Sequence, residues 1–203
     1  MAPHEREVSK QGIESQLAIN VLGHFKLVER IIDRIHKAPH GRIVFIASQI
    51  HLWSLGHIDF DDLNREKSYW KWIVYAQSKL GVLLVAHRLN RLLVQRGIDN
   101  VLVVAAHPGY AATKIHTHAV VGAYNNYFSQ SPDRCAKSYV MAAVDPNAER
   151  DGYCGPKYFL YGDPAWHSPK LPAADDVEMQ DRFWHACEQM SNTKLEEKVM
   201  SLK

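Results

Sequence analysis

Two short apolar runs on either side of a long helical stretch constrain the fold of this chain most. Residues 42–47 read RIVFIA and residues 100–106 read NVLVVAA. Unbroken apolar runs of this length, rich in Val and Ile, are typical of strands that are buried on both faces. Between them, residues 70–95 predict a long helix, which Gly97 is placed to end. Strand, helix and strand in this order predict a parallel sheet with helices on its faces.

The rest of the chain extends this α/β pattern. Apolar residues recur at helical spacing over residues 9–37, and Pro39, His40 and Gly41 follow them. We predict a further helix at residues 132–144, a third strand at residues 158–161 and a polar helical tail over about residues 168–203. The chain is therefore expected to form a single domain over residues 1–203.

Composition excludes several classes of protein. The chain has 203 residues, 46% of them hydrophobic and 23% charged, which is ordinary for one globular domain. A net charge of +2 without a Lys/Arg run gives no indication of a nucleic-acid or anionic membrane partner. No apolar stretch approaches the roughly 20 residues of a membrane span. The polar start, MAPHERE, does not resemble a signal peptide.

Cysteine and histidine usage points to a cytoplasmic protein without a metal centre. The three cysteines, Cys135, Cys154 and Cys187, are scattered and lack CxxC spacing, which predicts reduced thiols. The twelve histidines are dispersed as well. His116 and His118 are the closest pair, and neither has an acidic residue or a cysteine nearby. No zinc site is predicted.

Tyr75 and Lys79 lie four residues apart on the predicted helix 70–95 and therefore share one face. An ammonium close to a phenol favours the phenolate and lowers the tyrosine pKa from its usual ~10. A tyrosine of this kind can act as a general acid or base. By itself the pair is a weak signal, because tyrosine and lysine at this spacing are usually surface residues.

Two strand ends add to this pair. Ser48 directly follows the first predicted strand, and the Pro108-Gly109 turn lies just past the second. Ligands bind outside the carboxyl ends of strands in open parallel sheets. A right-handed crossover brings the first turns of the long helix close to the same edge. We therefore expect these two turns and the Tyr75–Lys79 pair to converge on one crevice.

Together these motifs resemble those of the short-chain dehydrogenase/reductases, particularly the branch that includes retinol dehydrogenases. The resemblance covers roughly residues 3–165 and follows the order of the family's motifs. It rests on five blocks: NVLGHF at 20–25, RIVFIASQIH at 42–51, IDFDDLN at 58–64, YAQSKL at 75–80 and HPGYAAT at 107–113. One departure is Ala47-Ser48, where the family commonly has two serines; the second is the reactive one.

The resemblance implies a catalytic role for four residues. Tyr75 corresponds to the acid/base that exchanges the hydroxyl proton, and Lys79 to the lysine that lowers the tyrosine pKa. Ser48 corresponds to the residue that holds the substrate oxygen and steadies its developing charge. Asn20 corresponds to the helix asparagine that supports a water in the proton relay. An exposed polar helix residue is the alternative for Asn20.

The implied cofactor is NADP or NAD, and this branch favours NADP. Tyr75 and Lys79 would contact its nicotinamide ribose. Pro108, Gly109 and Thr113 correspond to the turn that packs on the nicotinamide and binds its carboxamide. Thr113 can also be a helix N-cap, and the two roles are compatible.

No GxGxxG or GxxxGxG motif occurs in the sequence, although such a turn normally holds the cofactor diphosphate. The resemblance places residue 1 just after the family's Asn-Asn-Ala-Gly turn. We therefore expect the C-terminal part of a Rossmann-type doubly wound parallel sheet, without the first βαβ units. The strand at 42–47 would then have an unpaired apolar edge, and the chain alone would bind cofactor weakly and show little activity.

By resemblance the chain is an NAD(P)-dependent oxidoreductase that interconverts an apolar alcohol and its ketone or aldehyde. The apolar side chains after residue 113 favour an apolar substrate, although a plain packed helix explains them equally well: Val120, Val121, Tyr124, Tyr127 and Phe128. Pairing through the long helices would give a homodimer. The alternative is a non-catalytic fragment or pseudoenzyme that acts by associating with an intact homologue.

Overall fold

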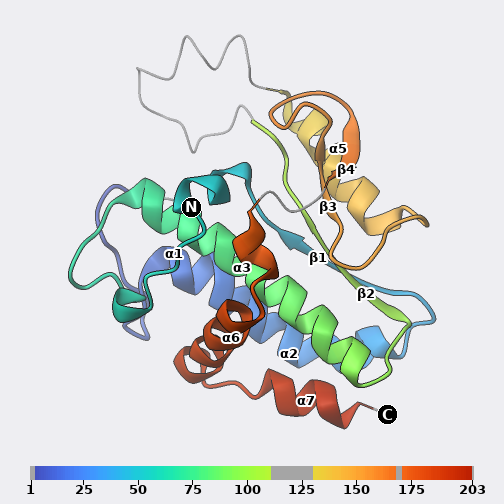
Figure 1. The fold of residues 1–203 in the computed structure, drawn as a ribbon, viewed down its shortest axis with the longest axis horizontal. Coiled ribbons are helices and arrows are strands. Elements are labelled where there is room, and N and C mark those ends of the chain that lie inside the picture. Colours follow the sequence, from blue (N-terminus) through green and yellow to red (C-terminus); the bar gives the residue numbers. More distant parts are fainter. Residues whose placement is uncertain (1–2, 111–129, 168–170, 203) are drawn as a thin grey trace.

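The structure, a computed structural model, describes residues 3–110, 130–167 and 171–202. Its centre is a four-stranded sheet in the order β1-β2-β3-β4 (Figure 1). The strands are β1 (Gly41–Ile46), β2 (Val101–Ala106), β3 (Tyr153–Pro156) and β4 (Pro164–His167). The first three are parallel, and β4 runs antiparallel to β3. The predicted α/β class with a parallel sheet is confirmed.

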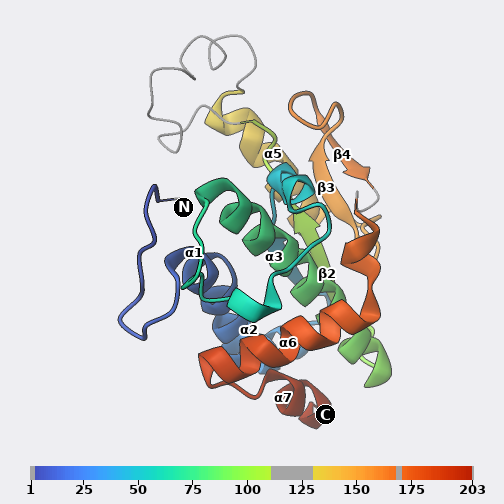
Figure 2. The same cartoon turned by 60° about the vertical axis from the view of Figure 1, so that its left-hand side comes forward.

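Helices cover both faces of this sheet. Alternate residues of β1 and β2 face opposite ways, so Ile43 and Val103 belong to one apolar cluster and Val44 and Val104 to another. The first cluster is built with α2 (Gly23–His36) and α3 (Lys71–Gln95), and the second with α5 (Pro132–Val144). Figure 1 shows β1 and β2 between α3 and α5, and in Figure 2 α5 and α6 (Val177–Ser191) lie on opposite sides of α3.

The long helix α3 confirms its predicted length and end. Gly97 has a φ of +73°, and its N–H donates to the carbonyl of Val94 over 2.9 Å. The N–H of Ile98 donates to the carbonyl of Leu93 over 2.9 Å, which completes a Schellman motif. The helix α5 also has its predicted bounds, with Ser131 as the N-cap.

The first helical stretch begins six residues later than the predicted residue 9. It consists of α1 (Ser15–Leu17), a π turn (Ala18–Leu22) and α2. The Glu14 carboxylate caps the start, accepting from the backbone N–H groups of Gln16 and Leu17 over 2.8 Å each. Glu14 therefore marks the start of the helix, and the preceding residues form a turn.

The predicted third strand at residues 158–161 is wrong. These residues form the tip of the hairpin between β3 and β4, and their side chains are exposed. The strand that pairs with β2 lies five residues earlier, where Tyr153 and Cys154 are buried. It was missed because its Gly155 and Pro156 are unfavourable for strands in general.

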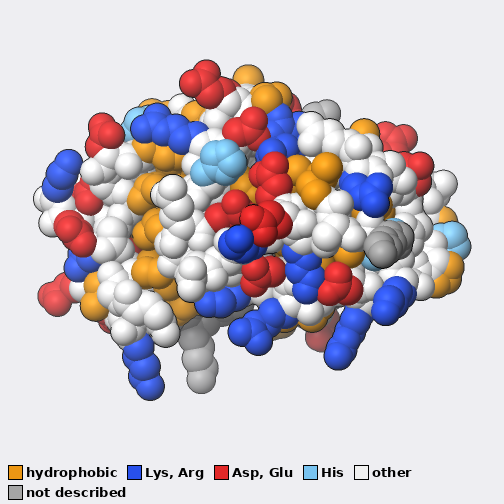
Figure 3. All heavy atoms as spheres, turned by 90° about the horizontal axis from the view of Figure 1, so that it is seen from below, with side chains coloured by type: hydrophobic (Ala, Val, Ile, Leu, Met, Phe, Trp, Pro, Cys, Tyr) orange, Lys and Arg blue, Asp and Glu red, His pale blue; other side chains and the backbone are white. Residues whose placement is uncertain are grey.

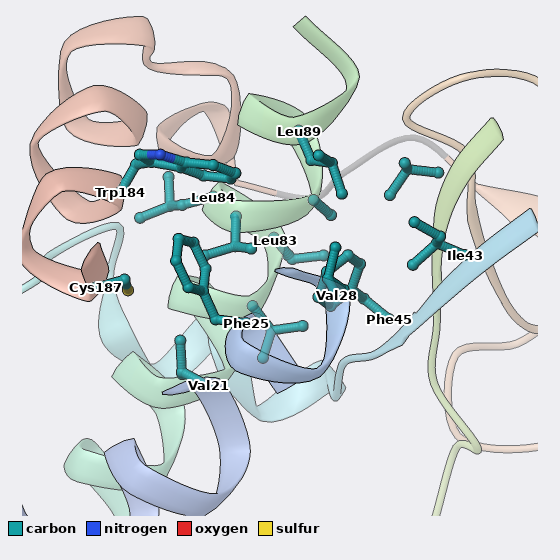
Figure 4. Packing of buried hydrophobic residues seen from close by; sticks show 14 of the residues in the cluster. Val21, Phe25, Val28, Ile43, Phe45, Leu83, Leu84, Leu89, Trp184 and Cys187 are labelled. Atoms are coloured by element: carbon teal, nitrogen blue, oxygen red, sulfur yellow. The ribbon is translucent and has the colours of Figure 1, made fainter. Parts of the chain in front are cut away.

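The C-terminal residues are helical, and several of their side chains are part of the core. The helices α6 (Val177–Ser191) and α7 (Leu195–Ser201) pack against α3 and α2. Trp184 is fully buried and meets Phe25 edge to face, with 4.7 Å between ring centroids (Figure 4). Aromatic rings in this geometry contribute beyond their buried area, so α6 helps to hold α2 and α3 together.

Within the described part of the chain, β1 lies at the outer edge of the sheet and pairs only with β2. A groove of about 230 Å³ separates this edge from α2. Its lining is almost entirely apolar: Leu27, Val28, Ile31, Ile35, Ile43, Val44, Phe45 and Ile46, with His24 and Arg42. The expected unpaired apolar edge is thus confirmed for these residues.

Charge is spread evenly over the face that carries α7. Figure 3 shows acidic and basic side chains mixed there, with apolar atoms between them. This agrees with the net charge of +2. Among the described helices, none is both long enough and apolar enough to cross a bilayer. All three cysteines are free and buried, as expected for reduced thiols.

Candidate functional site

Tyr75 and Ser48 meet at the carboxyl end of β1. Tyr75 lies early in α3, and its hydroxyl lies close enough to the Ser48 side chain for hydrogen bonding from Ser48 to lower its pKa. Ser48 follows β1 and caps the 3₁₀ helix Gln49–Ser54, accepting from the N–H of Ile50 over 3.3 Å. The expected convergence of the first strand end with the long helix is therefore present.

Lys79 joins this pair from the next turn of α3. Its Nζ lies 5.7 Å from the centroid of the Tyr75 ring and donates to the carbonyl of Ile46 over 2.9 Å. The side chain is only 6% exposed, and this burial lowers the pKa of Lys79 to about 8. Close to neutral pH, Lys79 can thus gain or lose a proton.

The pKa of Tyr75 differs from the expected lowering. Burial raises it above its usual value, and the hydrogen bond from Ser48 acts in the opposite direction but is the smaller effect. The Lys79 ammonium lies beside the ring and is bonded to Ile46, and its own burial disfavours its charged form. In this structure Tyr75 is therefore a protonated phenol at neutral pH, suited to donate.

Asn20 is connected to the same turn of α3 through Ser78. Its Nδ2 donates to the Ser78 hydroxyl over 3.0 Å, and that hydroxyl donates to the carbonyl of Tyr75 over 2.8 Å. Asn20 is 5% exposed, so it is not a surface residue. It lies in the π turn, a distortion that is frequent at functional sites. Neither the π turn nor the role of Ser78 was foreseen from the sequence.

The Pro108-Gly109 turn packs on the hairpin between β3 and β4. Gly109 has a φ of +74°, and a Cβ there would lie 2.6 Å from the carbonyl oxygen of Leu160. Only glycine fits this position. Around Gly109 lie Leu160 and Pro156 of the hairpin, the side-chain amide of Gln130, and the ring of His107, which accepts from the Gly109 N–H over 3.2 Å. Thr113 lies outside the described residues, as do His116 and His118.

A separate group of possible metal ligands lies between α6 and α7. Ligand atoms of His185, Glu188 and Glu196 come within 4.8 Å of one another. Glu196 is already bonded to Arg88 over 3.0 Å, and exposed acidic groups often cluster without an ion. Glu188 accepts from the backbone N–H of Glu196 over 2.9 Å, so the two carboxylates are explained by the packing of α7 against α6 and α3.

The chain has clear relatives among the dehydrogenases. Human retinol dehydrogenase 13 (Homo sapiens) is 33% identical over 190 residues, which cover 87% of this chain and 53% of the relative. Polyprenol dehydrogenase from Mus musculus is 32% identical over 189 residues, with coverages of 88% and 54%. The chain belongs to the short-chain dehydrogenase/reductase family. No protein-family model matches the sequence.

This short-chain dehydrogenase/reductase chain spans about half the length of the relatives it matches. A solved structure supports the fold. The crystal structure of an uncharacterized protein from Mycobacterium paratuberculosis has a TM-score of 0.74 and 27% identity, covering 94% of this chain and 63% of that one. The family assignment agrees with the resemblance in the five motif blocks.

Proposed function

We propose that the chain carries the proton-transfer centre of an NAD(P)-dependent oxidoreductase that interconverts an apolar alcohol and its ketone or aldehyde. The observation that supports this most is the position of the buried Lys79 at the carboxyl end of β1, where its Nζ lies 5.7 Å from the centroid of the Tyr75 ring and donates to the Ile46 carbonyl over 2.9 Å. A hydroxyl pair at this edge can hold one carbonyl oxygen between two donors.

In the reduction direction, Ser48 donates a hydrogen bond to the substrate oxygen as negative charge develops there. Tyr75, protonated because burial raises its pKa, then gives its proton to that oxygen. Lys79, with a pKa of about 8, can then return a proton to Tyr75. Asn20 holds this turn of α3 through Ser78. Oxidation of the alcohol uses the same residues in reverse.

The residues present fit the nicotinamide end of the cofactor. The Lys79 ammonium has three protons, and the bond to Ile46 uses one of them, so the others can meet ribose hydroxyls. Tyr75, Lys79, Pro108 and Gly109 would hold this end, and the bound cofactor would supply the hydride. Thr113 belongs to the same proposal. We propose NADP in preference to NAD, bound weakly because the sequence lacks a glycine-rich diphosphate turn.

The proposed substrates are long apolar alcohols and their carbonyl forms. The names of two relatives refer to retinol and polyprenol, both of this class. A cytoplasmic location is part of the proposal and agrees with the three free cysteines. A homodimer through the long helices remains a proposal.

A second candidate function is association with an intact homologue. It is favoured by the apolar groove beside β1, where an edge strand offers unpaired backbone groups. In this case the chain would act without catalysis of its own.

Steady-state kinetics with retinal and a polyprenal separate the two candidates. NADPH and NADH are each raised to millimolar concentration, because weak binding is expected. We expect turnover that Tyr75→Phe abolishes and that Tyr69→Phe, a matched tyrosine outside the site, leaves unchanged. Equal rates for Tyr75→Phe and the unmodified chain, or no turnover at any cofactor concentration, would reject the catalytic proposal.

A further inference from the structure

Three buried aromatic rings, His51, Tyr153 and His107, contact one another next to Ser48 and the Pro108-Gly109 turn, and we call this group the ring stack. Tyr153 of β3 is flanked by His107, stacked at 4.9 Å between centroids, and by His51, edge-on at 5.8 Å. All three side chains are at most 1% exposed. Neither Tyr153 nor His51 has a role in the resemblance or in the reaction described above.

His51 holds the backbone of the substrate-binding serine. Its Nδ1 lies 2.7 Å from the carbonyl oxygen of Ser48. A carbonyl can only accept, so Nδ1 carries the ring proton and Nε2 is a bare acceptor. This short bond fixes the turn from which the Ser48 side chain reaches Tyr75.

His107 contacts the Pro108-Gly109 turn and has the opposite tautomer to His51. The N–H of Gly109 donates to its Nδ1 over 3.2 Å, so the proton lies on Nε2. That Nε2 lies 3.3 Å from the side-chain nitrogen of Gln49, and exchanging the nitrogen and oxygen of this amide brings an acceptor to the ring. His107 thus connects the Pro108-Gly109 turn to the residue that follows Ser48.

The stack is not explained by stability. His51 Nε2 and the Tyr153 hydroxyl are buried and have no hydrogen-bond partner among the described residues. Such groups cost free energy that apolar side chains of similar size would not. The packing is also tight: a Cβ at Gly155 would lie 1.8 Å from His107 Nε2. Burial lowers the pKa of both histidines, to about 3 for His107, and keeps the rings neutral.

We propose that His51, Tyr153 and His107 form a positioning unit that sets the Ser48 turn and the Pro108-Gly109 turn relative to each other. His51 acts on Ser48 through its backbone carbonyl, His107 acts on Gly109 and Gln49, and the Tyr153 ring packs against both imidazoles. This inference rests on the proposed function, because it assigns the unit to the same site.

The test compares His51→Leu, which removes the donor, with His51→Asn, whose amide N–H can replace the Nδ1–H. His185→Leu, at an exposed histidine of α6, is the matched control. In ¹³C-tyrosine NMR titrations, His51→Leu should raise the pKa of Tyr75 further, because the Ser48 hydrogen bond that lowers it is disturbed. His51→Asn should restore the unmodified value. An unchanged Tyr75 pKa in folded His51→Leu would overturn the proposal.

Two further readouts keep the outcome clear. For turnover, His51→Leu should lower kcat by about 10- to 100-fold with little change in KM, as expected when a reacting group is displaced. Imidazole ¹⁵N spectra of the unmodified chain should show His51 protonated at Nδ1 and His107 at Nε2; the reverse tautomers contradict the proposal even if no variant folds. If the unmodified chain shows no turnover, the proposed function fails, whereas the two NMR results still decide the positioning role.

Discussion

Lys79 reaches from α3 to the end of β1, where its Nζ donates to the carbonyl of Ile46 over 2.9 Å. This bond places a buried ammonium beside Tyr75 and ties the long helix to the strand that leads into Ser48. The same burial lowers the pKa of Lys79 to about 8 from 10.5. The burial of Lys79 therefore affects both the geometry of the site and the stability of the fold.

This linkage predicts a pH dependence with a defined sign. Between pH 8 and 10.5 the unfolded chain binds more protons at Lys79 than the folded chain, so the free energy of unfolding rises with pH. The cost of burying the charged lysine is fully present below pH 8 and is relieved above it, by an amount on the order of 3 kcal/mol. The free energies of unfolding of the unmodified chain and of Lys79→Met, measured with urea, should therefore converge as pH increases from 7 to 10. A difference between the two free energies of unfolding that stays constant across this range would contradict the lowered pKa of Lys79.

Asn20 and Ser78 should be energetically coupled. Their 3.0 Å hydrogen bond is buried, so Asn20→Ala should lower the free energy of unfolding by roughly 1–3 kcal/mol. The double variant with Ser78→Ala should cost less than the sum of the single changes. Chemical denaturation of all four chains gives the coupling energy. Strict additivity would show that Asn20 does not act through Ser78.

Gly81→Ala tests the packing of α6 on α3. Alanine in a helix interior ordinarily stabilises by about 1 kcal/mol relative to glycine. Here a Cβ would lie 2.4 Å from Cζ of Phe183, so the change should instead destabilise by roughly 1–3 kcal/mol. Introducing Phe183→Leu as well should recover part of the loss. Thermal unfolding measures both effects, and a higher Tm for Gly81→Ala alone would mean that α6 does not pack there.

The groove beside β1 should drive self-association. Leu27 is 52% exposed and lines this groove, so Leu27→Lys should raise the concentration at which light scattering begins and change stability by less than about 0.5 kcal/mol. Val140→Lys on α5 is the control, since Val140 is 59% exposed and does not line the groove. Equal effects of the two substitutions would indicate general charge repulsion and not a specific edge.

Elements with local signals could be predicted from the sequence. The end of α3 depends on Gly97, and the start of α5 on Ser131 and Pro132, so their bounds were predictable. The strand β3 was not, because Tyr153 and Gly155 are buried by contacts with His107, which is distant in sequence. Tertiary contacts outweigh strand propensity in this segment.

The candidate site, too, was predictable from the sequence only in part. The position of Ser48, Tyr75 and Lys79 at one edge of the sheet was predictable, because strand order and crossover handedness fix where these residues lie. The direction of the Tyr75 pKa shift was not predictable, since it depends on how deeply the hydroxyl is buried. The π turn at Asn20 and the ring stack at His51 likewise depend on packing that no short motif encodes.

The central claim is that Tyr75 transfers the proton when hydride reaches an apolar carbonyl. The most direct measurement is deuterium transfer from 4-deuterated NADPH to retinal, followed by mass spectrometry of the alcohol, which detects slow turnover at millimolar cofactor. We predict deuterated retinol from the unmodified chain and a loss of at least about 100-fold in Tyr75→Phe. Absence of label from the unmodified chain, or equal labelling by Tyr75→Phe, would contradict the account.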